Sequence, residues 1–368
     1  MTLNALGVTT VAEPETWTVA LIGNPNTGKS TLFGALSGIR QRVGNYPGVT
    51  VEKKLGGMTL GSSRWTLVDL PGTYSLAPRS PDEQVAVDVL LGRQSDVPAP
   101  DVIVCVVDAS NLERNLYLLS QVLELNRPTV VALTMVDVAE GRGMTVDARR
   151  LSANLGVPVV PVRADQRVGL DALKEAMATE VGRPLERRER VSPFPEAFQA
   201  EVTGLAEVLA ASSAGGEDLS KFPRYLVERL LLDTGGYFEG HVLSEARPEL
   251  REALLASRAR LAEGGHPVPA VEAMARYGWV AEVVAGVVAR PEESVVTRGD
   301  RIDAVLTHRV WGTLILAVAM LLTFNAVFSW ATLPMDAIDA GVGALAGLVE
   351  SSLPEGALRS LLAEGVVG

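Results

Sequence analysis

The sequence is poor in cysteine and in positive charge, and both shortages limit what the protein can be. Its single cysteine, Cys105, lies in an apolar run, so the chain cannot form an internal disulfide, as expected for a reducing cytoplasm. Acidic residues number 44 against 33 basic ones, and the resulting formal net charge of −11 argues against a nucleic-acid partner. The N-terminus has no cationic stretch followed by an apolar core, so we expect no cleavable signal.

Long uncharged runs are also scarce, and the exception is residues 310–333. This run is long enough to cross a bilayer as a helix, whereas a buried helix of a soluble protein would usually carry a polar face. Arginines gather before it, at Arg298, Arg301 and Arg309. Since positive charge stays on the cytoplasmic side, we expect a transmembrane helix whose preceding part is cytoplasmic.

The strongest motif present is a phosphate-binding loop. An apolar run over residues 17–22 delivers the pattern G-x-x-x-x-G-K-[ST] to the start of a helix. Backbone N–H groups of such a loop converge on phosphate oxygens, Lys29 reaches the β- and γ-phosphates, and the Ser30 hydroxyl binds Mg²⁺. The predicted nucleotide contacts are Gly23, Asn24, Pro25, Asn26, Thr27, Gly28, Lys29, Ser30 and Thr31.

Two later segments fit the same nucleotide. A short apolar strand ends in Asp69-Leu70-Pro71-Gly72, where Asp69 would hold Mg²⁺ through a water and the Gly72 amide would contact the γ-phosphate. We call residues 44–50 the first switch and residues 72–76 the second switch. In the first switch, the Thr50 hydroxyl would complete the Mg²⁺ shell, next to Gly48 and Val49. No Gln follows Gly72, so we expect slow intrinsic hydrolysis.

Base recognition is expected after the next buried strands. The segment Thr134-Met135-Val136-Asp137 follows an apolar run, and the Asp137 carboxylate can accept hydrogen bonds from guanine N1 and N2, which adenine cannot supply. A backbone amide near Ala164 would donate to guanine O6, and the neighbouring predicted contacts are Val162 and Arg163. The nucleotide is therefore predicted to be GTP or GDP.

Alternating strands and helices over residues 1–183 predict an α/β P-loop GTPase domain, with a mainly parallel sheet covered by helices on both faces. Residues 184–292 show helical spacing and predict an all-α domain, in which we assign no metal to His241 or His266. The remaining divisions are a juxtamembrane linker, the transmembrane helix and the start of a truncated membrane domain, at residues 293–309, 310–333 and 334–368.

Three segments, residues 41–52, 69–76 and 300–312, closely resemble the ferrous iron transport protein B family, which transports Fe²⁺ across the bacterial inner membrane. The resemblance implies that GTP regulates or drives iron uptake, that the helical domain steadies bound GDP, and that K⁺ stimulates hydrolysis with Asn26 as a ligand. The family usually has Asn in place of Thr134 and Ser in place of Arg163. We expect Thr134 to lose an amide that braces the phosphate-binding loop, and nucleotide affinity to suffer.

A lone transmembrane helix cannot enclose an ion path, so we expect the chain to be a fragment, or half of a split system, that works with a missing membrane permease portion. Small cytoplasmic iron-transport accessory proteins and a second copy of the chain are further candidate partners. Asp336 and Asp339 either bind iron or mark the helix exit. The alternative function is a membrane-tethered GTP/GDP-sensing interaction module in which hydrolysis is incidental. The acidic charge and the apolar run disfavour a soluble ribosome-assembly GTPase.

Overall fold

A computed structural model describes the residues considered below, and it divides the chain into two compact units, Met1–Ser294 and Val295–Gly368. Two predicted residues, Gly48 and His241, lie outside the described part of the chain. The described residues are 16–38, 41–47, 49–78, 80–94, 96–183, 192–211, 223–235, 248–290, 298–330, 332–354, 356–362 and 365.

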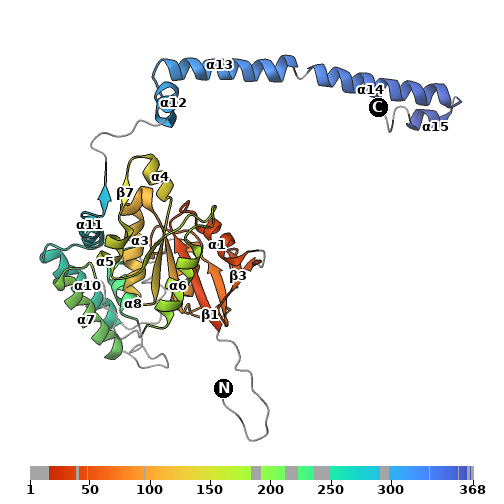
Figure 1. Cartoon of the computed structure of the whole chain (residues 1–368). Helices are drawn as coiled ribbons and strands as arrows, with labels where there is room; N and C mark the ends of the chain where they lie inside the picture. Colours follow the sequence, from red (N-terminus) through yellow and green to blue (C-terminus); the bar gives the residue numbers. More distant parts are fainter. Residues whose placement is uncertain are drawn as a thin grey trace, which may run out of the picture. The chain divides into compact units, whose positions relative to one another are not determined.

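The first unit is built on a seven-stranded sheet with the order β2-β3-β4-β1-β5-β6-β8 (Figure 1). The strands are β1 (Thr16–Gly23), β2 (Gln41–Asn45), β3 (Glu52–Leu60), β4 (Ser63–Asp69), β5 (Val102–Asp108), β6 (Thr129–Thr134) and β8 (Val159–Pro161). Strands β4, β1, β5, β6 and β8 run parallel to one another, which confirms the predicted mainly parallel sheet. Strands β2 and β3 pair antiparallel and were not predicted.

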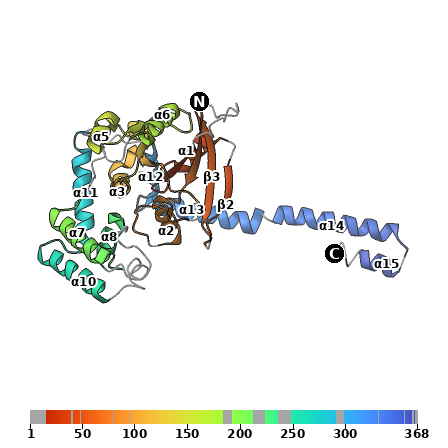
Figure 2. The ribbon, with the colours of Figure 1, turned by 90° about the horizontal axis from the view of Figure 1, so that it is seen from below.

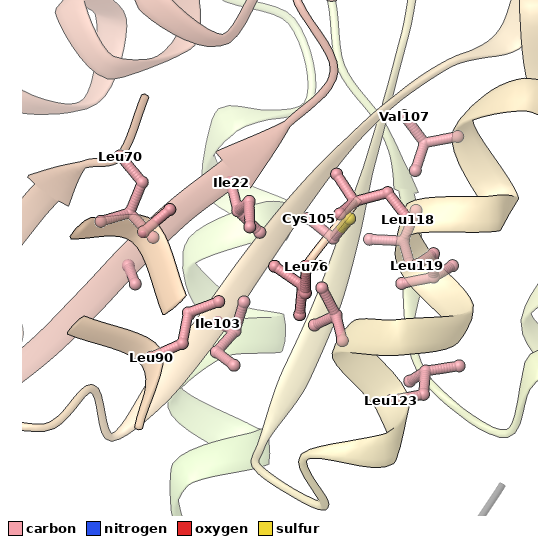
Figure 3. Close-up of a cluster of buried hydrophobic side chains, with 14 of the residues drawn as sticks. Ile22, Leu70, Leu76, Leu90, Ile103, Cys105, Val107, Leu118, Leu119 and Leu123 are labelled. Carbon is pink, nitrogen blue, oxygen red and sulfur yellow. The ribbon is translucent and has the colours of Figure 1, made fainter. Parts of the chain in front are cut away.

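Side chains of the parallel strands alternate between two cores, as the two-residue period of a strand requires. In β1, Ala20 and Ile22 point to one core, while Val19 and Leu21 point to the other. The first core includes Cys105, whose thiol pKa burial raises to about 12, so the thiol stays protonated (Figure 3). Both faces of the sheet are buried, which explains why these strands read as continuous apolar runs.

Helices cover both faces of the sheet. Helices α2 and α3 supply buried side chains to the core that contains Cys105, and α1 and α6 supply them to the other. The helices of this part are α1 (Lys29–Ser37), α2 (Pro81–Leu90), α3 (Leu112–Glu124), α4 (Val136–Gly141), α5 (Ala148–Leu155) and α6 (Leu170–Val181), with a 3₁₀ turn at Ala109–Asn111.

The rest of the first unit is helical as predicted, with one exception. Its helices are α7 (Glu196–Ala211), α8 (Arg224–Leu232), α10 (Pro248–Glu263) and α11 (Ala270–Val284). Helices α7, α8 and α10 supply most of a third core, to which α11 adds Val271. Helix α11 also lies along α3, as Figures 1 and 2 show. The exception is a two-residue strand, β9 (Val288–Ala289), which pairs antiparallel with β7 (Thr145–Val146). Helix α11 and β9 thus fasten the helical part to the sheet-containing part.

The second unit consists of helices and contains the predicted membrane segment. One helix among the described residues, at Trp311–Phe328, is long and apolar enough to cross a membrane. The predicted transmembrane helix covers residues 310–333. Within this range α13 ends at Asn325, and a π-helix follows it at Ala326–Trp330. The elements are α12 (Arg298–Leu306), α13 (Trp311–Asn325), the π-helix, α14 (Thr332–Ser352) and α15 (Ala357–Ser360).

Candidate nucleotide-binding site

The phosphate-binding loop joins the end of β1 to the start of α1. Gly28 precedes the helix with a φ of +81°, a left-handed conformation that favours glycine. Asn26 is also left-handed, with a φ of +65°, and its side chain is exposed. Helix α1 begins at Lys29, so its first backbone N–H groups are available at the loop, and the positive end of the helix favours a phosphate there.

A cavity of about 300 Å³ brings together four of the predicted phosphate and metal residues: Lys29, Ser30, Thr50 and Asp69. Lys29 Nζ contacts Asp69 Oδ1, and both side chains are nearly buried. The hydroxyls of Ser30 and Thr50 and the Asp69 carboxylate are oxygen donors of the kind that Mg²⁺ prefers, so this donor set fits the ion. The remaining lining residues are the predicted Leu70 and Pro71 and the unpredicted Val51, Glu52, Lys54 and Asp82.

The second switch begins against the phosphate-binding loop. A Cβ atom placed on Gly72 would lie 3.3 Å from Pro25 Cα, and the Thr73 amide donates to the Gly23 carbonyl at 3.2 Å. Thr73 is buried, and its hydroxyl donates to the Ser75 carbonyl at 2.6 Å. That hydroxyl is therefore used within the second switch and is not arranged to position a water.

Thr134 corrects one expectation. Its hydroxyl lies 2.8 Å from the Thr27 carbonyl oxygen and donates to it, while the Thr27 hydroxyl donates to the Asn24 carbonyl at 2.9 Å. Thr134 and Thr27 are both buried. The brace that we expected to be lost with the family's Asn is thus made by the threonine hydroxyl.

The predicted base-recognition residues lie at the carboxyl ends of β6 and β8. Met135 adopts a left-handed φ of +54° ahead of α4, which leaves Asp137 exposed in the first turn of that helix. Arg163 Nη2 lies 3.0 Å from Oε2 of Glu140, a residue that belongs to α4 like Asp137. This ion pair brings the segment of Arg163 and Ala164 to the helix that carries Asp137. Arg163, the second departure from the family pattern, therefore joins the two base-recognition segments.

Tyr46 is a residue of the first switch that the sequence did not single out. Its side chain is 1% exposed, and its hydroxyl has no hydrogen-bond partner among the described residues. Burial, followed by the charges of Asp96 and Asp69, raises the pKa of this hydroxyl. The Tyr46 amide donates to the Val51 carbonyl at 3.0 Å, so the buried ring fixes the turn that carries Thr50.

The second switch is hydrogen-bonded to helices far away in the sequence, and these contacts were also not predicted. Gln121 of α3 accepts a hydrogen bond from the Leu76 amide at 2.5 Å and donates to Glu272 of α11 at 3.0 Å. The Tyr225 hydroxyl of α8 donates to the Leu76 carbonyl at 2.7 Å. Two helices of the helical part therefore contact the second switch directly or through one side chain.

A buried charge network continues from these contacts. Arg276 is 0% exposed and lies 2.8 Å from Glu124 and 2.9 Å from Glu272, while Arg229 lies 2.5 Å from Glu272. Burial would raise the pKa of Glu272, but the two guanidiniums outweigh it and hold the pKa at about 2. Burial dominates at Glu124 and raises its pKa to about 6 despite Arg276. These opposite charges are buried in a region that carries no recognised motif, so no sequence pattern reveals them.

Among the residues that the structure describes, no group of three or more His, Cys, Asp or Glu side chains is placed to hold a metal ion. Asp336 and Asp339 are exposed on α14. Both interpretations, binding of iron and marking of the helix exit, remain predictions.

Comparison with known proteins points to one family. The family described as ferrous iron transport protein B matches residues 17–177. The solved structure of the cytosolic domain of Legionella pneumophila FeoB is 36% identical in sequence and has a TM-score of 0.59. The match covers 74% of this chain and all of that domain. A point mutant of S. thermophilus NFeoB bound to GDP is 32% identical, with a TM-score of 0.62 and the same coverage.

Longer relatives extend the similarity into the second unit. A Porphyromonas gingivalis Fe(2+) transport protein A/Fe(2+) transporter FeoB fusion protein is 35% identical over 95% of this chain. The Leptospira biflexa Fe(2+) transporter FeoB is 31% identical over 95% of the chain. The chain spans 41% and 49% of the length of these two relatives.

Proposed function

The chain belongs to the ferrous iron transport protein B family, and we propose that it binds and hydrolyses GTP as the cytoplasmic part of a bacterial ferrous iron transporter. The observation that carries the proposal is that Lys29, Ser30, Thr50 and Asp69 line one cavity. Hydrolysis in this site regulates or drives Fe²⁺ uptake across the inner membrane, in a transporter that includes a further membrane permease portion.

In this proposal each residue of the site has one task. Lys29 and the amides of the phosphate-binding loop neutralise the β- and γ-phosphates, and Gly72 reports the γ-phosphate to the second switch. To bind the nucleotide, Lys29 must exchange part of its contact with Asp69 for phosphate oxygens. Ser30, Thr50 and Asp69 would hold Mg²⁺, which supplies positive charge to the transferring phosphoryl group. Because Thr73 is committed to Ser75, the attacking water has no positioning side chain there, and the intrinsic rate is slow.

The second switch and the helical part act together in this scheme. Tyr225 and Gln121 hold Leu76, so a change of the second switch on γ-phosphate loss must alter contacts with α8 and α11. These contacts also favour the second candidate function, a membrane-tethered GTP/GDP sensor that signals by conformation. Phosphate release measured together with capture of partner proteins in GTP and in GDP distinguishes the two functions.

The location follows from the second unit. Helix α13 crosses the inner membrane, with Arg301 and Arg309 on the cytoplasmic side together with the first unit. The partners are the permease portion, small cytoplasmic accessory proteins of iron transport and, as an open alternative, a second copy of the chain.

The guanine specificity provides the sharpest test. We expect GTP and GDP to displace a bound fluorescent GDP, while ATP fails, because only guanine donates from N1 and N2 to Asp137. Asp137→Asn replaces a carboxylate acceptor by an amide that can also donate, so we expect the affinity for GTP to fall at least about tenfold. The same variant should favour xanthosine triphosphate, whose base has a carbonyl group in place of the guanine amino group. Asp171→Asn, an exposed change on α6, is the matched control. Equal displacement by ATP and GTP would contradict the proposal.

A further inference from the structure

One segment that the family resemblance singled out, residues 300–312, has no part in the nucleotide site. It contains the end of α12 and the start of α13, which run in different directions and meet at a short connection (Figure 1). Only residues 307–310 separate the two helices. A fixed angle at this position would set how α12 lies relative to the membrane-spanning helix.

The connection is held by specific contacts. His308 Nδ1 accepts hydrogen bonds from the amides of Val310 at 3.2 Å and Trp311 at 3.3 Å, so its side chain caps the start of α13. The Gly312 amide donates to the His308 carbonyl at 2.7 Å. A Cβ atom on residue 312 would lie 2.1 Å from the Leu306 carbonyl oxygen, so only glycine allows this close approach. The corner between α12 and α13 is therefore a built feature of the chain.

Helix α12 has an apolar side and a polar side. Ile302, Val305 and Leu306 have the spacing i, i+3, i+4 of one helix face, and they are 60%, 51% and 50% exposed. Arg301 lies one turn before Val305 on the same side. Asp303 lies one turn before Leu306, on the other flank of this face, and with Arg309 in the connection the charges beside the face are two positive and one negative.

We propose that α12 lies in the cytoplasmic surface of the membrane, with Ile302, Val305 and Leu306 in contact with lipid and with Arg301 and Arg309 near anionic headgroups. This inference rests on the proposed function, in which α13 spans the bilayer. Four connecting residues reach at most about 14 Å, so the end of α12 cannot leave the interfacial zone next to the span. An exposed apolar face beside arginines at that depth has the character of an interfacial amphipathic helix.

Trp311 also indicates that the corner between α12 and α13 lies at the membrane–water interface. It is 58% exposed at the first position of α13, and tryptophan side chains favour the membrane–water interface. The occupant of the α12 face is thus a lipid surface that carries negative charge. A covering protein segment or a second copy of the chain would give a different labelling pattern in the experiment below.

The test labels six consecutive positions of the full chain, residues 302–307, one at a time with a nitroxide on an introduced cysteine. The background carries Cys105→Ala, and the chain is placed in vesicles of phosphatidylcholine and phosphatidylglycerol. The ratio of accessibility to oxygen over a nickel chelate should be at least about twofold higher at 302, 305 and 306 than at 303, 304 and 307. High nickel accessibility at all six positions, or low accessibility to both reagents at 302, 305 and 306, would overturn the inference.

Two further measurements separate this inference from the proposed function. A label at Leu316 in α13 should report the bilayer interior. If Leu316 is in lipid but the α12 pattern is missing, only the inference fails, whereas a water-accessible Leu316 removes the membrane part of the proposed function as well. Removing phosphatidylglycerol, or changing Arg301 and Arg309 to Gln, should lower the ratio of oxygen to nickel-chelate accessibility at residue 302 at least about twofold. Arg359→Gln is the matched control, and an unchanged label in the double variant would contradict the role of the arginines.

Discussion

Thr134 supports the phosphate-binding loop through one buried hydroxyl group. The hydroxyl donates to the Thr27 carbonyl, and Thr27 in turn donates to Asn24, so three buried residues form a chain of hydrogen bonds beneath the phosphates. Loss of a buried donor leaves the carbonyl oxygen without its partner, which costs roughly 1–3 kcal/mol. The loop conformation, rather than a contact to the base, depends on this residue.

We therefore expect Thr134→Ala to weaken GTP and GDP binding alike, by about 1–2 kcal/mol or roughly tenfold in Kd. Thr134→Ser keeps the hydroxyl and is the matched control, which should bind within about twofold of the unchanged chain. Titration of a fluorescent GDP measures both variants. An alanine variant with unchanged affinity would show that the hydrogen bond to Thr27 has no role in holding the loop.

Asn26 leads to a second prediction at this scale. Its side chain is exposed in the phosphate-binding loop, where an amide oxygen would help to hold K⁺. A monovalent cation there stabilises negative charge as it develops on the phosphates. We expect hydrolysis to rise when K⁺ replaces Na⁺ at constant ionic strength, and Asn26→Ala to remove the difference. Turnover that does not distinguish the two salts would exclude this assignment.

Residues with a chemical task of their own could be predicted from the sequence, because their motifs fix both residue type and spacing. Lys29, Ser30 and Asp69 are examples, and the structure brings them into one cavity. Tyr46 and Gln121 could not be predicted in this way. Their importance arises from burial and from partners distant in the sequence, and neither leaves a local pattern.

At the scale of elements, the charge network around α11 joins the helical part to α3. Glu272 accepts hydrogen bonds from Arg229, Arg276 and Gln121 through the same oxygen. Its folded pKa of about 2 lies below the 4.5 of a free side chain, so its contribution to stability is fully present above about pH 4.5 and is lost as the pH falls toward 2. This difference corresponds to about 3 kcal/mol.

The pKa of Glu124 is shifted in the opposite direction. Its pKa is raised to about 6, so protonation between about pH 6 and pH 4.5 favours the folded state. The two carboxyls together predict that acid destabilises the first unit only below about pH 4.5, where Glu272 begins to gain a proton. A network of buried charges thus sets the pH at which the helical part loosens.

Glu272→Gln tests this account. The variant leaves two buried guanidiniums without their shared countercharge, so we expect a loss of about 3–5 kcal/mol near neutral pH and a flatter response to acid. Denaturant unfolding of the full chain in detergent, followed by circular dichroism between about pH 7 and pH 3, measures both effects. Glu282→Gln, an exposed change on the same helix, should leave both unchanged. A steep acid transition that survives in Glu272→Gln would assign the acid response to other groups.

Among the elements, those with strong periodicity were predictable and those defined by pairing were not. The central parallel strands β1, β5 and β6 are buried on both faces, and this produces apolar runs that are visible in the sequence. Strands β2 and β3 form the edge of the sheet, and most of their side chains are exposed or half-buried, so no such run marks them. Strand β9 has two residues and exists only because β7 pairs with it.

At the scale of the whole molecule, nucleotide chemistry and membrane attachment belong to different units. Every described residue of the candidate nucleotide site lies in Met1–Ser294, and the apolar helix lies in Val295–Gly368. The predicted divisions at residues 183/184, 292/293, 309/310 and 333/334 remain predictions. The cytosolic domain of the Legionella pneumophila relative, solved as a separate chain, aligns in full with 74% of this sequence. We therefore expect the first unit to fold without the second.

The final prediction follows from this division. A chain that ends at Ser294 should remain in solution without detergent and bind GDP within about twofold of the full chain, because no described residue of the site is removed. The full chain should resist alkaline extraction from membranes, since its helical segment Trp311–Phe328 is long and apolar enough to cross a bilayer and the shorter chain lacks it. Sedimentation after extraction and titration with fluorescent GDP measure the two properties. A tenfold loss of GDP affinity in the shorter chain would mean that the second unit takes part in nucleotide binding, and membrane retention of the shorter chain would place an attachment site in the first unit.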